Sequence, residues 1–115
     1  MIEGKLKVKI LSSGATVPQR AHPGDAGLDF FVKDVDLTGR NDEHIVKICA
    51  NYADGRWNEA VEVRQGESIR VSTGISVAIP HGYVGLMFGR SGFGFKDGLA
   101  PSNCVGVVDS GYRGD

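Results

Sequence analysis

The chain has 115 residues and a mass of 12.3 kDa, which is enough for one domain with a single sandwich or barrel core. Its formal net charge of -1 at pH 7 lacks the basic excess of a general nucleic-acid or anionic-membrane binder. We therefore expect neither nucleic acid nor a membrane among its partners. The 17 glycines predict many tight turns.

The cysteines and histidines predict no metal cage and no disulfide framework. Cys49 and Cys104 each stand among apolar residues without a Cys-x-x-Cys spacing, which favours reduced, buried thiols over a disulfide. The histidines are isolated, so no zinc-ligand pattern can be assembled. The N-terminus opens no signal-peptide run and no stretch approaches a membrane span, so we expect a cytosolic protein.

The first third of the chain predicts two strands and a turn. Residues 5–11 alternate lysines with Leu, Val and Ile, the period of a half-buried strand, and the lysines suit a sheet edge. Residues 26–32 form a second predicted strand with Asp29 among apolar neighbours. That carboxylate needs a cation, N–H donors or a position at a site mouth, unless it is an ordinary acid at a strand end. Residues 34–41 are polar and predicted to turn.

The middle of the chain predicts a hairpin-like excursion at about residues 42–62. Two short apolar runs, 45–50 and 60–63, are the strands of this hairpin. More strands are expected within 68–79 and 83–88. Apolar residues nowhere recur with helical spacing over ten positions, so the sequence predicts an all-β fold.

A glycine-rich stretch follows over residues 89–99. Its glycines let backbone approach a ligand closely, while Arg90, Ser91 and Lys96 suit phosphate oxygens, which makes it a candidate phosphate cradle. It is not a Walker A motif, because Asp97 follows the lysine and no strand-to-helix transition is expected. A plain surface turn is the alternative.

The last residues predict a hairpin around Asp109-Ser110-Gly111, with valines before the turn and Tyr112 after it. The glycine of this turn is able to take a positive φ. A carboxylate at this turn could activate water, and the Tyr112 ring could floor a small flat or sugar-like ligand. The alternative is an ordinary turn acid beside a core tyrosine.

Three stretches in order, 26–29, 89–92 and 106–114, resemble the first three sequence boxes of the trimeric dUTPases, the dUTP diphosphatases. Asn103 falls where that family keeps its uracil-facing asparagine. The resemblance implies a distorted jelly-roll (β-clip) subunit that forms a homotrimer with active sites between subunits. It also implies Mg²⁺-dependent hydrolysis of dUTP to dUMP and pyrophosphate.

The resemblance also implies a role for each candidate residue. Asp109 would orient and deprotonate the attacking water, and Tyr112 would lie against the deoxyribose and leave no room for a 2′-hydroxyl. Asn103 and backbone near Gly106 would read the uracil edge. Asp29 would organise the site near the metal without binding it directly. The phosphates would be held by Arg90, Ser91 and Gly92.

The sequence departs from the family pattern at three places. Gly89 stands where the family usually has proline before its arginine, which alters loop stiffness. The excursion at 42–62 is longer than in compact members. The sequence ends at Asp115, directly after the third box, so it lacks the fourth box, the glycine-rich tail and the last strands of the jelly roll. We therefore expect an incomplete product or record.

Two other functions remain open at this point. One is that of the related dCTP deaminases, which share the fold and an Arg-Ser box. The other is a non-catalytic interaction module that works through the arm at 42–62. The first box and the spacing from Asn103 to Tyr112 favour the dUTPase.

Overall fold

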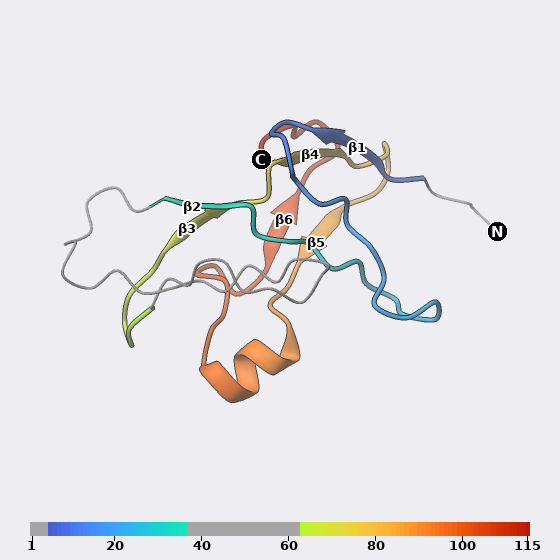
Figure 1. Ribbon diagram of the computed structural model, residues 1–115. Helices are drawn as coiled ribbons and strands as arrows, with labels where there is room; N and C mark the ends of the chain where they lie inside the picture. Colours follow the sequence, from blue (N-terminus) through green and yellow to red (C-terminus); the bar gives the residue numbers. More distant parts are fainter. Residues whose placement is uncertain (1–4, 37–62) are drawn as a thin grey trace. The chain divides into compact units, whose positions relative to one another are not determined.

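The structure is a computed structural model that describes residues 5–36 and 63–115. The strands pair as three two-stranded sheets, β1 with β4, β2 with β3 and β5 with β6 (Figure 1). Strands dominate, which confirms the all-β prediction. In chain order the elements are β1 (Lys7–Ile10), β2 (Asp34–Asp36), β3 (Arg70–Ser72), β4 (Ile75–Ala78), β5 (Gly85–Met87), the π-helix η2 (Phe93–Asp97) and β6 (Gly106–Val108).

The chain divides into two compact units. One contains Met1–Lys9 and Ser76–Asp115, and the other contains Ile10–Ile75. The predicted excursion at 42–62 lies outside the described residues, as do both of its predicted strands except for Val63. The prediction of one domain stays a prediction.

In the second unit, β2 pairs with β3 in antiparallel register. Val35 lies opposite Val71, and Asp36 lies opposite Arg70. The prediction of a turn over 34–41 is therefore wrong at its start. Val35 is half-buried and lies between two exposed acids. This alternation covers only three residues of a polar stretch, which is too short to be recognised as a strand from the sequence.

The predicted strand over 26–32 also does not form as such. Asp29 makes an isolated antiparallel bridge with Gln19, in which each backbone N–H donates to the other residue's carbonyl, at 2.8 and 3.2 Å. This bridge is isolated, so the residues on either side of Asp29 do not continue it as a β-ladder. The sequence pattern correctly placed extended backbone around Asp29, but the paired part is one residue and not the predicted strand over 26–32.

In the first unit, β5 and β6 form an antiparallel ladder in which Gly85 lies opposite Val108 and Met87 opposite Gly106. The strands approach so closely that a Cβ on Gly85 would lie 3.0 Å from Val108 Cβ and 2.9 Å from Ile79 Cδ1. The hairpin prediction is wrong about the partner: β6 pairs with the earlier strand, not with residues after the turn.

The buried part of the described residues is small. Ile75 is 2% exposed and Ser76 is 6% exposed, and both lie at the start of β4. Large apolar side chains elsewhere in the first unit, such as Leu86 and Val107, are exposed. Within the described ranges, no helix has the length and apolar character needed to cross a membrane.

Candidate functional site

The turn that carries Asp109 follows directly from β6. The Tyr112 backbone N–H donates to the Asp109 carbonyl at 3.1 Å, which closes the predicted turn. The Asp109 and Tyr112 side chains are both exposed. Gly111 does not have a positive φ, so the turn closes without using the backbone freedom of this glycine. A carboxylate and an aromatic ring nevertheless stand open to solvent on one short turn.

Two interactions hold the end of this turn. Arg113 Nη1 donates to the carbonyls of Ser110 and Tyr112, at 2.7 and 2.8 Å, so the guanidinium folds back over its own turn. Ser76 Oγ donates to the Arg113 carbonyl at 2.6 Å. Sequence reasoning missed both contacts. The available signal was a serine at an alternate position of the strand, next to the buried Ile75.

Gly114 determines where the Tyr112 ring can lie. A Cβ built on Gly114 would collide with the ring and its hydroxyl, so the ring covers the backbone of this glycine. The absence of a side chain at 114 is therefore a condition for the observed ring position. Tyr112 as a whole remains 54% exposed, which leaves surface for a ligand.

Asn103 lies at the other end of β6, in two consecutive tight turns. The Cys104 N–H donates to the Pro101 carbonyl at 3.0 Å, and the Val105 N–H donates to the Asn103 carbonyl at 2.7 Å. Cys104 has φ of 65°, which with the i to i+2 hydrogen bond matches a strained γ-turn. Cys104 is also exposed, so the prediction of a buried thiol is wrong for it. Cys49 lies outside the described residues.

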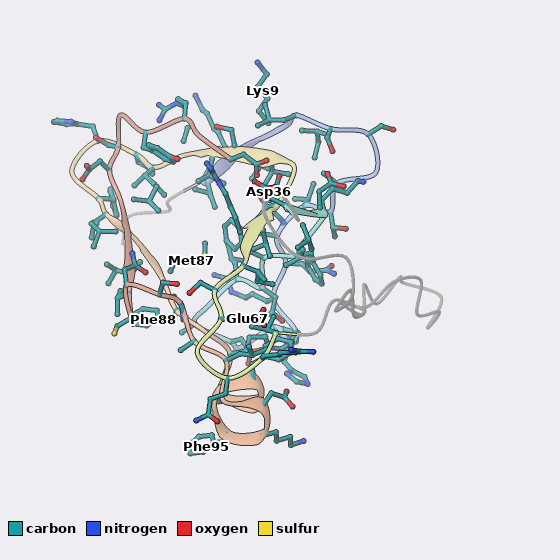
Figure 2. All side chains as sticks on the ribbon, turned by 90° about the vertical axis from the view of Figure 1, so that its left-hand side faces the viewer. Lys9, Asp36, Glu67, Met87, Phe88 and Phe95 are labelled. Carbon is teal, nitrogen blue, oxygen red and sulfur yellow. The ribbon has the colours of Figure 1, made fainter. Side chains whose placement is uncertain are left out.

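The glycine-rich stretch contains a helix, which the sequence did not predict. η2 follows Arg90, Ser91 and Gly92, and the Gly94 N–H donates to the Arg90 carbonyl at 3.1 Å. The fold thus does turn from a strand into a helix here. π-Helices are rare in proteins, and those that occur often lie at functional sites. No residue of η2 is buried, and Phe95 projects from it with 92% of its surface exposed (Figure 2).

The candidate residues of the first unit separate to opposite ends of the β5–β6 ladder. Met87 lies opposite Gly106, so the chain leaving β5 toward Arg90 lies at the end where Asn103 precedes β6. A Cβ on Gly89 would lie 3.1 Å from Pro101 Cδ, which confirms that these two segments are adjacent. The Asp109 turn follows Val108, at the Gly85 end of the ladder.

Asp29 belongs to the second unit, where it is half-buried and bridged to Gln19. No metal-sized cluster of three or more His, Cys, Asp or Glu side chains occurs within residues 5–36 and 63–115. The chemical content of the site is therefore a solvated carboxylate, an aromatic face, an amide and a guanidinium.

Comparison with known proteins identifies similar chains. A sequence model of the family described as dUTPase matches residues 54–115. The deoxyuridine 5′-triphosphate nucleotidohydrolases of Nocardia farcinica and Rhodococcus erythropolis are each 39% identical over 110 residues, which is 96% of this chain and 52% of theirs. This chain thus spans about half the length of the curated relatives it matches.

A solved structure is also similar. It is that of a mutant dUTPase from phage phi11 of S. aureus, which was described for its coordination of a structural Mg(II) ion. The two chains share 31% sequence identity and a TM-score of 0.62, over 96% of this chain and 55% of that one. The all-β, jelly-roll-like fold is therefore shared with that protein.

Proposed function

Because the chain belongs to the dUTPase family, we propose that it hydrolyses dUTP to dUMP and pyrophosphate with Mg²⁺. The observation that carries this proposal is the turn at Asp109–Tyr112, where an exposed carboxylate and an exposed ring are held on a closed turn at the end of β6. Such a turn suits a reaction that needs one positioned base and one sugar-sized contact surface.

The nucleoside is proposed to lie along β6. The uracil would sit at the Asn103 and Gly106 end, and the deoxyribose would contact Tyr112 at the other end. The three residues of β6 span roughly 10 Å, which suits a nucleoside. The Asn103 amide and nearby backbone groups would pair with uracil, and cytosine would leave those groups unpaired. The Tyr112 ring would exclude a 2′-hydroxyl by contact.

Asp109 is proposed to act as the general base. Its carboxylate is exposed, so it can accept a proton from a water molecule placed against the phosphate chain. The proposed roles of Asp109 and Tyr112 are compatible because one turn presents both groups. Asp29 is proposed to help organise the site near the metal, through water, as the family resemblance implies.

The phosphates are proposed to be held by a second copy of the chain. Arg90, Ser91 and Gly92 offer a guanidinium fork, a hydroxyl and a backbone N–H, which suit phosphate oxygens. They follow β5 at the end of the ladder opposite the Asp109 turn. A nucleoside whose sugar lies at that turn extends its phosphates away from this chain's own Arg90. This supports active sites between subunits, and the family resemblance implies that these subunits form a homotrimer.

The described residues fit a Mg²⁺ ion that arrives with the triphosphate. Mg²⁺ keeps several waters and commonly binds through substrate phosphates and one or two carboxylates. Phosphate oxygens and water can fill its coordination sphere, so no protein residue is proposed as a direct ligand, and residues 5–36 and 63–115 hold no cluster of three or more His, Cys, Asp or Glu side chains. When bound, the ion would neutralise charge on the phosphates. The cytosolic location stays a prediction.

Turnover of four nucleotides tests this function. Pyrophosphate release from dUTP, dCTP, dTTP and UTP is measured with Mg²⁺ for the chain and for Asp109→Asn. We expect release from dUTP alone, reduced about 10²- to 10⁴-fold in the variant, with an unchanged circular dichroism spectrum. Absence of release from every nucleotide contradicts the proposal for this chain, and ammonia release from dCTP replaces it with a deaminase.

A further inference from the structure

Ser76 is a buried hydroxyl that no part of the proposed reaction uses. It lies in β4 with 6% of its surface exposed, beside Ile75 at 2%. A buried hydroxyl needs a hydrogen-bond partner, because leaving it unpaired is costly. Ser76 Oγ finds that partner 37 residues further along the chain, in the Arg113 carbonyl at 2.6 Å.

The segment fastened by this bond carries the reactive groups of the site. Upstream, Val108 is fixed by the β5–β6 ladder opposite Gly85. Downstream, the Arg113 carbonyl is fixed by Ser76. Asp109 and Tyr112 lie between these two points. Ser76 thus joins the turn to β4, where the least exposed of the described residues lie.

The other contact of this segment cannot replace that anchor. The Arg113 guanidinium donates to Ser110 and Tyr112, which are members of the same turn. These bonds shape the turn but do not attach it to another element. The Ser76 hydroxyl, in contrast, links the turn to β4.

We propose that Ser76 is a positioning residue whose hydroxyl holds the downstream end of the Asp109–Tyr112 turn, so that the carboxylate and the ring keep their relative placement. The kinetic consequence rests on the proposed function. The anchoring itself does not, because it concerns the backbone of the turn in the free protein.

Matched variants at Ser76 test the proposal in the full chain. Thr and Val have the same shape and both suit a strand, but only Thr keeps the hydroxyl. Amide hydrogen exchange is measured at Tyr112, whose N–H donates to the Asp109 carbonyl, with Leu86 in β5 as the internal reference. We expect exchange at the turn to rise about tenfold in Ser76→Val and to stay near native in Ser76→Thr, with Leu86 unchanged in both.

The kinetic measurement asks whether this anchoring matters for the reaction. For dUTP hydrolysis we expect Ser76→Val to lower kcat about tenfold with a smaller change in KM, and Ser76→Thr to restore kcat. A general loss of stability would not lower kcat in Ser76→Val and leave it near native in Ser76→Thr. If either larger side chain prevents folding, Ser76→Ala removes the hydroxyl without adding volume and is expected to give the same exchange pattern as Val.

Equal exchange at the turn in the Val and Thr variants overturns the proposal, as does native-like exchange in Ser76→Ala. Equal kcat in Val and Thr overturns its kinetic part. If the unsubstituted chain does not hydrolyse dUTP, the proposed function fails, and the exchange measurements still decide whether Ser76 anchors the turn.

Discussion

The two ends of the β5–β6 ladder are held in different ways. At one end, the Asp109–Tyr112 turn is fastened upstream by β6 and downstream by Ser76. At the other end, the chain leaves β5 toward Arg90 and η2, none of whose residues is buried. The proposed base and sugar contact thus lie at the end of the ladder that is fastened on both sides, whereas the proposed phosphate-holding segment leads into an exposed helix.

The strongest way to break this comparison is to mix two defective variants. Asp109→Asn and Arg90→Ala are each expected to lower dUTP hydrolysis at least about 100-fold. If each site takes Asp109 from one copy and Arg90 from another, refolding the two together at equal concentration restores about one quarter of native activity. Pyrophosphate release measures the result. A mixture as inactive as its components shows that both groups act from the same chain.

A pair of glycine substitutions compares the stability of the two regions. Gly85→Ala places a Cβ 3.0 Å from Val108 Cβ, and we expect it to lower the free energy of unfolding by about 1–3 kcal/mol. Gly94→Ala in η2 meets no atom within 4 Å and is expected to raise it by about 0.5–1 kcal/mol. Urea unfolding measures both, and effects of the same sign would contradict the contrast.

A second pair of glycines tests the Tyr112 ring. Gly114→Ala forces the ring to move, because the new Cβ would occupy its position, and we expect KM for dUTP to rise about tenfold with weaker discrimination against UTP. Gly111→Ala is the control, since its Cβ meets no atom within 4 Å and its φ is not positive. Steady-state kinetics on dUTP and UTP measure KM for both variants. Equal KM values for Gly114→Ala and Gly111→Ala would refute the role of the ring.

A modest effect on stability is expected at the strained turn before β6. Cys104→Gly removes the penalty for a side chain at φ of 65° and is expected to raise the free energy of unfolding by about 1 kcal/mol. Cys104→Ala keeps the strained backbone and should give no such gain. A thermal melt compares the two, and an equal melting temperature would mean that the turn is not strained in solution.

The sequence pattern located most strands of the first unit. It did not predict which strands pair, because pairing depends on segments that are far apart in the sequence. The valine-rich stretches before Asp109 and the alternating residues around Ile75 predicted β6 and β4, because a period of two is a local signal. The partner of β6 was not predictable, since the turn favoured a hairpin and the real ladder joins it to Gly85–Met87.

The missed helix and the missed anchor have physical explanations too. Residues 91–97 contain two glycines and place their phenylalanines two positions apart, so no amphipathic helical pattern exists. Ser76 looks like an ordinary polar position in a strand, and its bond to Arg113 is visible only in three dimensions. The site residues came from motif resemblance, whereas their mutual placement required the ladder register.

The long sequence separation of the Ser76–Arg113 bond has a consequence for the order of folding. The bond closes a loop of 37 residues, and every candidate site residue except Asp29 lies inside it. Closing a fully flexible loop of that length costs on the order of 3 kcal/mol in chain entropy. The β5–β6 ladder lies inside the loop and shortens the part that this bond still has to close. The turn can be fastened only after residue 113 has been synthesised and has returned to β4. The reactive geometry is therefore expected to be acquired late, through a non-local and comparatively slow step.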